Sequence, residues 1–321
     1  MRQLPALQDV PSIQDIQETH EAIQGMIHRT PVMTSSQLDA MAGAQLYFKC
    51  ENFQKVGAFK MRGGASAAVR LTEAEKVKGI ATHSSGNHAQ AVARAAQVLG
   101  IPAYIVMPQN APSIKKAATA GYGAQIIECA PTLEARESTL EEVVADTGAT
   151  FIHPYNDYNV IAGQATAALE MLADMPAPDI VMAPIGGGGL MSGTALTTRY
   201  LLPHVKLIGA EPKAVDDAYR SFTSGTMQVN TSIDTIADGL RTNLGEKTFG
   251  IIKEHLDDIL TVTEESIVMA MRLIWERMKI IIEPSCAVPF AAVLSNPERF
   301  AGRTVGIILT GGNVDLEKLP F

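Results

Sequence analysis

The sequence predicts an α/β fold in which parallel β-sheets are covered by helices on both faces. Short apolar segments alternate along the chain with longer segments rich in Ala, Leu, Glu and Arg, and this alternation is typical of strand–helix repeats. The apolar segments are continuous, as expected for strands buried on both faces. No internal repeat, low-complexity tract or long linker interrupts the pattern.

Nine apolar segments are predicted strands. They are 45–51, 78–84, 103–108, 124–129, 150–155, 179–185, 206–212, 258–262 and 304–310. Residues 88–100 and 133–148 are predicted helices, and the second ends on Gly148, a residue type common at helix C-caps. Because the block 78–152 contains several compact strand–helix units, we predict that it forms a small domain inserted in a larger one. The larger domain would then consist of residues 1–69 and 156–321.

Composition and charge narrow the class of protein. The chain has 321 residues, of which 46% are hydrophobic and 19% charged, and its formal net charge is -8. An acidic surface disfavours nucleic acid and anionic membranes as main partners. The N-terminus lacks a signal peptide's apolar block, and no apolar run reaches the roughly 18 residues needed to span a bilayer. Three widely spaced cysteines indicate neither a disulfide framework nor a zinc site. We therefore expect a cytoplasmic protein without a nucleic-acid or membrane partner.

Ligands of such sheets bind beyond the carboxyl ends of the strands, and the first motif there is APIGGGGLMSGTAL, residues 183–196. Its four glycines precede a helix expected to begin near Leu190. Converging N–H groups at a helix N-terminus favour a phosphate. No dinucleotide fingerprint fits, and Thr194 and Ala195 stand where a P-loop requires Lys and then Ser or Thr. The alternative is a flexible turn.

Two further strand ends carry polar motifs. THSSGNHAQA, residues 82–91, crowds side chains around Gly86 at a helix start, where they suit either a substrate carboxylate or an ordinary N-cap. The candidate carboxylate ligands are Ser84, Ser85, Asn87 and His88. TGGNVD, residues 310–315, suits either close approach to a ligand or a tight turn.

Lys60 stands in apolar surroundings, between Phe59 and Met61 in GAFKMRGG. Most lysines of this kind are surface residues whose stems lie along apolar neighbours. Desolvation would instead lower the pKa of the amine and make it nucleophilic near neutral pH. A lysine that forms a Schiff base commonly partners a phosphorylated aldehyde. The lysine and the glycine loop together therefore indicate pyridoxal phosphate.

The motifs together resemble those of the fold-type II pyridoxal-phosphate enzymes, and among them the serine/threonine dehydratases and serine racemases. They occur in family order from about Ile16 to Asp315. They are FKMRG, SSGNH, HPYN, IAGQ, GGGGLMSG, EP…DD, ERMK…EPS and TGGNVD. The resemblance implies a tryptophan synthase β-like fold, with two parallel-sheet α/β domains and the active site between them.

The resemblance also implies a role for each matching residue. Lys60 would bind the cofactor aldehyde and later remove the substrate's α-proton. Phe59 would pack against the pyridine ring, Asn87 would bond its 3′-oxygen, and Thr310 would face its ring nitrogen. A neutral hydroxyl there leaves the ring a weak electron sink, which favours prompt loss of a β-leaving group over transamination. The implied phosphate cup is Gly186, Gly187, Gly188, Gly189 and Leu190.

Two features resemble the racemase-like subgroup. SSGNH replaces the SAGNH of typical dehydratases, so Ser85 is a candidate second acid/base group on the substrate face opposite Lys60, as racemisation requires. Alternatively, Ser85 only bonds a carboxylate. Arg136 falls where the subgroup places an arginine near the distal end of the substrate, which makes 3-hydroxyaspartate a candidate. Because Arg136 belongs to an amphipathic helix among acids, a surface ion pair is the alternative.

The resemblance further implies a divalent-metal site at Glu211, the carbonyl of Val215, and Asp217, suited to Mg²⁺, Ca²⁺ or Mn²⁺. Solvated loop charge is the alternative. A homodimer and ATP as an effector are also implied. One departure is Tyr155, which stands where the animal serine racemases have Asn.

The leading hypothesis is a pyridoxal-phosphate-dependent serine/threonine ammonia-lyase. Such an enzyme eliminates water and ammonia from L-serine, L-threonine or 3-hydroxyaspartate and yields 2-keto acids. The first alternative is an amino-acid racemase acting on serine through Lys60 and Ser85, alone or in addition to elimination. A non-catalytic sensor of a phosphate ligand is disfavoured by the intact lysine motif, and β-replacement by the SSGNH and GGNVD contexts.

Overall fold

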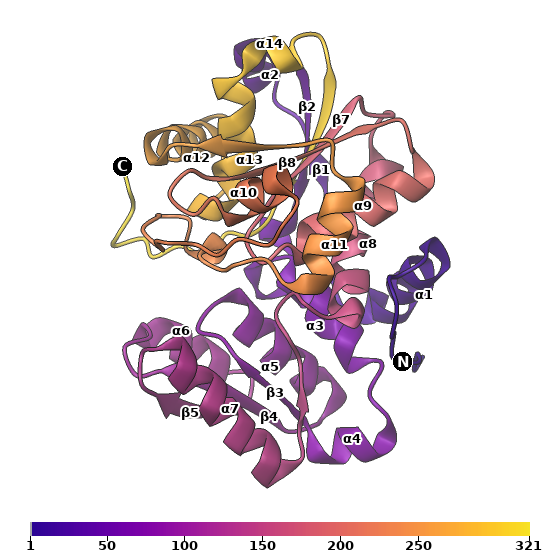
Figure 1. The fold of residues 1–321 in the computed structure, drawn as a ribbon, viewed down its shortest axis with the longest axis vertical. Helices are drawn as coiled ribbons and strands as arrows, with labels where there is room; N and C mark the ends of the chain where they lie inside the picture. Colours follow the sequence, from indigo (N-terminus) through magenta and orange to yellow (C-terminus); the bar gives the residue numbers. More distant parts are fainter. Residues whose placement is uncertain (1) are drawn as a thin grey trace.

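The computed structural model describes residues 2–321, except for the side chain of Ile114, and contains two β-sheets. Figure 1 shows the larger sheet with its helices in the upper part of the molecule and the smaller sheet in the lower part. Among the described residues, no helix combines the length and apolar character needed to cross a bilayer.

The larger sheet has the strand order β1-β2-β10-β7-β8-β9. These strands are β1 (Val32–Met33), β2 (Gln45–Cys50), β10 (Thr304–Leu309), β7 (Ile180–Pro184), β8 (Lys206–Pro212) and β9 (Asp258–Val262). All neighbours are parallel except β1 and β2, which run antiparallel with Val32 opposite Lys49. The predicted parallel sheet is confirmed. The antiparallel edge strand β1 was not predicted, because a two-residue strand is too short to produce an apolar pattern.

The smaller sheet is entirely parallel, with the order β5-β4-β3-β6. Its strands are β5 (Gln125–Cys129), β4 (Ala103–Pro108), β3 (Ile80–His83) and β6 (Thr150–Phe151). All four lie within the block 78–152, whereas the boundaries of the inserted domain stay a prediction. The predicted strand 150–155 ends early, because His153 Nδ1 accepts the backbone N–H groups of Tyr155 and Asn156 at 3.3 and 2.9 Å and turns the chain.

Helices cover both faces of the sheets. They are α1 (Ile13–Ile23), α2 (Ser36–Ala42), α3 (Lys60–Ala68), α4 (Glu73–Lys78), α5 (Asn87–Leu99), α6 (Ser113–Ala120), α7 (Leu133–Thr147), α8 (Tyr158–Asp174), α9 (Gly189–Leu201), α10 (Asp217–Ser224), α11 (Glu246–His255), α12 (Glu264–Met278), α13 (Pro284–Ser295) and α14 (Pro297–Phe300). The predicted helices 88–100 and 133–148 are confirmed as α5 and α7. Gly148 caps α7 in the left-handed region, at φ 68°, as expected.

Alternate residues of the central strands enter two different cores. Met182 and Ile307 pack with helices α12 and α13, whereas Val181 and Ile308 pack with α8 and α9 on the opposite face. Successive strand side chains point to opposite faces. A strand covered on both faces must therefore be apolar throughout, which explains the continuous pattern of the sequence.

Helix α3 lies between the two sheets and packs closely against α5 and α8 (Figure 1). A Cβ at Gly64 would lie 3.0 Å from the carbonyl oxygen of Ala91 in α5, and one at Gly163 of α8 would lie 2.4 Å from that of Arg62. Glycine is required at such contacts because any side chain would hold the backbones apart. The Gly63–Gly64 pair after Lys60 is thus part of a helix interface rather than a bend.

Candidate active site

Strands β2, β10 and β7 are neighbours in the larger sheet, and their carboxyl ends bring together three predicted motifs. The N–H of Phe59 donates to the carbonyl of Thr310 at 2.9 Å, and Ala58 forms a β-bridge with Gly311. The glycine loop follows β7 directly. Lys60, Thr310 and the glycines therefore share one edge of the sheet, where ligands of parallel sheets bind.

The Lys60 amine is held at the junction between the two sheets. Its Nζ donates to the carbonyl oxygen of Pro154, which follows β6, at 2.7 Å and lies 5.2 Å from the Phe59 ring centroid. Burial lowers the pKa of Lys60 to about 8, although the Glu283 carboxylate acts in the opposite direction. An amine with this pKa is partly neutral near physiological pH and can act as a nucleophile or base.

A strained turn delivers Lys60 to this place. Val56 has a φ of 59°, which is unfavourable for a β-branched residue, and Gly57 follows at 69°. The Asn313 side chain supports the turn, since its Nδ2 donates to the carbonyl of Val56 at 2.8 Å. Backbone strain of this kind persists where the surroundings hold it, often at functional sites.

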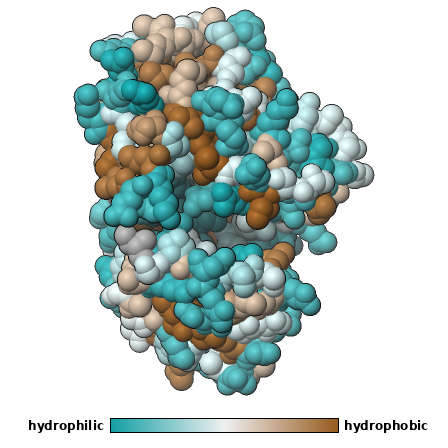
Figure 2. Space-filling view, turned by 90° about the vertical axis from the view of Figure 1, so that its left-hand side faces the viewer, coloured by the Kyte–Doolittle hydropathy of each residue, from teal (hydrophilic) through white to brown (hydrophobic). Residues whose placement is uncertain are grey.

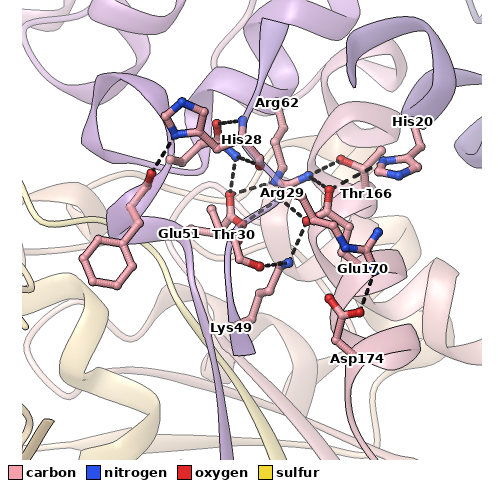
Figure 3. A network of polar contacts seen from close by, with 12 residues as sticks. His20, His28, Arg29, Thr30, Lys49, Glu51, Arg62, Thr166, Glu170 and Asp174 are labelled. Carbon is pink, nitrogen blue, oxygen red and sulfur yellow. Dashed lines mark hydrogen bonds and ion pairs between the residues drawn. The ribbon is translucent and has the colours of Figure 1, made fainter. Parts of the chain in front are cut away.

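A buried ion cluster anchors the Lys60 segment on both sides (Figure 3). Arg62 donates two bonds to Glu51 and two to Glu170, at 2.7 to 3.0 Å, and Lys49 donates to Glu170 at 2.6 Å. All four side chains are at most 1% exposed. Burial would raise the pKa of Glu170, but its bonds with Arg62 and Lys49 lower it below the ordinary value. Sequence reasoning missed this cluster.

The four-glycine loop packs closely against neighbouring side chains at the start of α9. A Cβ at Gly187 would lie 2.3 Å from the Tyr155 ring, and one at Gly188 would lie 2.8 Å from Leu244 and Thr248. Gly188 has a φ of 86° and caps α9, so the first N–H groups of the helix are free of intrahelical partners. This geometry favours the predicted phosphate cup. The Tyr155 ring packs against Gly187 of this loop. Nothing in the sequence predicted this contact, and Tyr155 was noted only because the animal serine racemases have Asn at its position.

Thr310 and Asn87 approach the same region from the two sheets. Thr310 is 3% exposed, and its Oγ1 has no hydrogen-bond partner among the described residues. A buried hydroxyl without a protein partner is able to bond a ligand atom. Asn87 is the first residue of α5, which follows β3 in the chain. Its Nδ2 donates to Glu283, which directly precedes α13.

The SSGNH loop connects β3 to α5. Ser84 Oγ accepts the N–H of Gly86 at 3.2 Å, and Ser85 is partly exposed. The ring of His88 is engaged within the protein, because its Nε2 donates to the carbonyl of Ile152 at 3.0 Å and the residue is 3% exposed. Burial lowers the pKa of His88 well below the ordinary value. The neutral ring then has no second N–H to offer, and only its backbone amide in the first turn of α5 remains for a carboxylate.

Arg136 lies on α7 near the end of β3. Its Nε bonds the carbonyl of Thr132 at 3.3 Å. Burial and the nearby Arg136 guanidinium lower the pKa of His83, which directly precedes Ser84. Within the described part of the chain Arg136 forms no ion pair, although Glu134 and Glu137 are close in sequence. The surface ion-pair alternative is therefore not what the structure contains.

Glu211 and Asp217 are buried together beyond β8. Glu211 accepts the N–H groups of Ala218 and Tyr219 at 3.3 and 2.5 Å, and Asp217 accepts that of Leu244 at 2.8 Å. Burial raises the pKa of Glu211 well above its ordinary value, with Asp217 adding to the shift, and raises the pKa of Asp217 to about 6. In residues 2–321 no set of three or more His, Cys, Asp or Glu side chains suits a metal. Any cation here would therefore need carbonyl and water ligands as well.

The surface is hollowed at mid-height, between the two sheet-containing parts, and hydrophilic residues line the recess (Figure 2). A separate cavity of about 370 Å³ lies at the amino ends of β7 and β8, bordered by Asp179, Lys206 and Arg299. That is the edge of the sheet opposite the glycine loop, so the cavity lies away from the predicted chemistry.

Comparison with known families identifies the architecture. The model of the family described as "Pyridoxal-phosphate dependent enzyme" matches residues 23–311. The chain belongs to this pyridoxal-phosphate-dependent enzyme family. The residues present fit the cofactor, since a weakly basic amine, a glycine-lined helix start and an unpaired buried hydroxyl share one sheet edge. The fold-type II resemblance is confirmed.

Individual members of the pyridoxal-phosphate-dependent family align along nearly the whole chain. The beta-hydroxyaspartate dehydratase of Paracoccus denitrificans is 50% identical over 97% of this chain and 99% of its own. The L-threo-3-hydroxyaspartate ammonia-lyase of Saccharomyces cerevisiae is 47% identical over 96% and 95%. The crystal structure of serine racemase from Dictyostelium discoideum superposes with a TM-score of 0.91 and 49% identity, covering 95% of this chain and 99% of that one.

Proposed function

We propose that this protein is a pyridoxal-phosphate-dependent ammonia-lyase that acts on small β-hydroxy amino acids, with 3-hydroxyaspartate as its preferred substrate. The single observation that carries the proposal is the Lys60 amine, whose pKa is lowered to about 8 at the shared edge of β2, β10 and β7. Similarity to two hydroxyaspartate-eliminating enzymes supports the substrate class.

Each residue of the site has a chemical task in this proposal. When bound, the cofactor supplies electron withdrawal from the substrate α-carbon. Lys60 Nζ takes the proton from that carbon, the electron pair of the broken C–H bond forms the Cα–Cβ double bond, and the β-hydroxyl leaves with a proton as water. The hydroxyl of Thr310 accepts or donates one hydrogen bond without imposing a charge at the ring nitrogen. The N–H groups around Gly188 hold the phosphate and so fix the orientation of the reacting carbon.

Arg136 accounts for the preference for a second carboxylate. Its guanidinium has no acidic partner among the residues described and lies near His83, next to the serine loop. A β-carboxylate would meet a bidentate donor there, whereas serine and threonine offer no group to pair with it.

A racemase activity is the second candidate function. Ser85 is partly exposed at the end of β3, and no hydrogen bond of its hydroxyl is found within the described chain. A free hydroxyl in the serine loop is available to exchange a proton on the face opposite Lys60. The similarity to the Dictyostelium serine racemase supports this candidate.

We further propose that Glu211, the Val215 carbonyl and Asp217 bind Mg²⁺, with Ca²⁺ or Mn²⁺ as substitutes. The support is a pair of neighbouring buried carboxylates in which Asp217 raises the pKa of Glu211, because a divalent cation would relieve this repulsion. Leu244 links this site to the cup, since its N–H bonds Asp217 and its side chain borders Gly188. Homodimerisation and ATP as an effector remain proposals from the family resemblance, and a cytoplasmic location remains a proposal from the cysteine spacing and the N-terminal sequence.

The test is a substrate panel with the purified holoenzyme. Release of 2-keto acid and ammonia would be measured for 3-hydroxyaspartate, L-serine and L-threonine, and D-serine would be followed by chiral chromatography. We expect the largest kcat/KM for 3-hydroxyaspartate. The absence of keto acid from all three substrates would refute the ammonia-lyase.

A further inference from the structure

Two residues outside the predicted site, Glu283 and Asn313, enclose the side chain of Asn87. Glu283 directly precedes α13 and is 4% exposed, and both of its carboxylate oxygens lie 3.1 Å from Asn87 Nδ2. The backbone N–H of Asn313 donates to the same carboxylate at 3.3 Å. The carboxylate therefore has three short polar contacts, all of them from donors.

The other end of the Asn87 amide is occupied as well. Asn313 Nδ2 donates to Asn87 Oδ1 at 2.9 Å and to the carbonyl of Val56 at 2.8 Å. An amide nitrogen carries two hydrogens, so both of those on Asn313 are used. Because the carbonyl of Val56 can only accept, it fixes the position of the Asn313 nitrogen. The oxygen of Asn87 must therefore face that nitrogen, and the nitrogen of Asn87 must face Glu283.

This arrangement leaves one donor of Asn87 free. The nitrogen has two hydrogens, and the carboxylate of Glu283 takes one of them. The second is available to a ligand in the site. If the side-chain amide of Asn87 were reversed, its oxygen would face Glu283. Asn87 would then offer no N–H to a ligand in the site.

We propose that Glu283 and Asn313 are positioning residues that orient the Asn87 amide so that its free N–H meets the 3′-oxygen of the bound cofactor. The inference rests on the proposed function, in which Asn87 bonds that oxygen. The proposal also explains the glycine at position 311 of the TGGN motif. A Cβ at Gly311 would lie 2.8 Å from Glu283 Oε1, so glycine is needed to let the carboxylate reach Asn87.

The same three side chains connect the two sheets. Asn87 follows β3 of the smaller sheet, whereas Asn313 follows β10 of the larger one and Glu283 begins a helix on its face. The orientation of the cofactor-facing amide thus depends on the placement of one sheet against the other. An isolated SSGNH loop would contain no such constraint.

The charge of Glu283 offers a second explanation for a change in cofactor binding when this residue is replaced. The carboxylate opposes the fall in the pKa of Lys60, so a substitution there would alter the amine as well as Asn87. Asn313→Asp separates the two effects when it is compared with and without Asn87, because a change of charge at position 313 acts on Lys60 in both backgrounds. It preserves the side-chain shape and leaves Glu283 in place, but it replaces the donor that faces Asn87 Oδ1 with an acceptor.

The experiment is a double-mutant cycle between Asn313→Asp and Asn87→Ala. For each apoprotein, the dissociation constant of pyridoxal phosphate and the visible absorption band of the loaded enzyme are measured, since the 3′-oxygen is part of the chromophore. We expect Asn313→Asp to weaken cofactor binding about tenfold and to shift the band. In the Asn87→Ala background, the same change should weaken binding less than about twofold.

Equal effects of Asn313→Asp in both backgrounds, or no effect in the first, would overturn the proposal. Asn296→Asp is the matched control, because it also removes an N–H that bonds a backbone carbonyl, that of Ala292, outside the site. It should leave the dissociation constant unchanged. If Asn313→Asp does not fold, as judged by thermal unfolding, the cycle is run with Asn313→Ala, which removes the same donor and leaves Glu283 in place. A wild-type enzyme that binds cofactor but releases no keto acid would count against the proposed function alone.

Discussion

The guanidinium of Arg62 lies against the carboxylate of Glu170, with Nη2 2.7 Å from Oε2, although both side chains are shielded from solvent. Arg62 stands two positions after Lys60 in α3, and Glu170 belongs to α8. The pair therefore holds α3, which carries the Lys60 amine, against α8.

Removing one partner of this pair should destabilise the protein strongly. Glu170→Gln leaves Arg62 and Lys49 buried with one carboxylate too few, and we expect the free energy of unfolding to fall by about 3–5 kcal/mol. Chemical denaturation of the apoprotein measures the loss. Glu73→Gln, which removes the exposed partner of Lys76, is the control and should cost less than about 1 kcal/mol. Similar losses for the two variants would contradict the structural role of the cluster.

The Lys60 amine should titrate well below an ordinary lysine. Its pKa falls from 10.5 to about 8 on burial, so between these values the unfolded chain binds more protons than the folded one. The contribution of Lys60 to the free energy of unfolding consequently rises with pH across this window. Reductive methylation of the apoprotein, followed by peptide mass spectrometry, should show Lys60 reacting with a midpoint near pH 8. A midpoint near 10.5 would rule out the lowered pKa.

Arg136 should control substrate choice. Arg136→Met removes the guanidinium but keeps much of the stem, and we expect kcat/KM for 3-hydroxyaspartate to fall about 10–100-fold with little change for L-serine. Steady-state keto-acid release with both substrates provides the ratio. Arg303→Met, at the opposite edge of the larger sheet, should leave the ratio unchanged. Equal losses for both substrates would show that Arg136 does not contact the distal carboxylate.

Ser85 should be required for racemisation alone. Ser85→Ala removes the candidate proton carrier on one face of the substrate, while Lys60 remains on the other. We expect D-serine formation from L-serine to disappear and L-serine elimination to change by less than about threefold. Chiral chromatography and keto-acid release measure the two activities. Persistent D-serine in the variant would assign the second proton transfer to another group.

Bound Mg²⁺ should raise the thermal unfolding temperature, because a ligand that binds only the folded state stabilises it. The increase should follow the cation concentration and be lost in Glu211→Gln, which removes one buried carboxylate charge. Glu254→Gln, an exposed acid on α11, should retain the full increase. An identical response in the two variants would place the cation elsewhere.

The sequence alone determined the strand–helix alternation, and it predicted the phosphate cup at the four-glycine loop and the unusual setting of Lys60. These features are local, because each depends on residues that are neighbours in the chain. The resemblance of the ordered motifs then identified the family. Even so, the antiparallel β1 was missed, since two residues form no pattern.

Only the tertiary structure decided which groups surround those motifs. Arg62 and Glu170 are separated by 108 positions, and Asn87 and Glu283 by 196. The burial of the His88 ring against Ile152 likewise depends on how β6 pairs with β3. Burial and the placement of charges set the pKa of a lysine and the orientation of an amide, and both arise only when distant segments pack together.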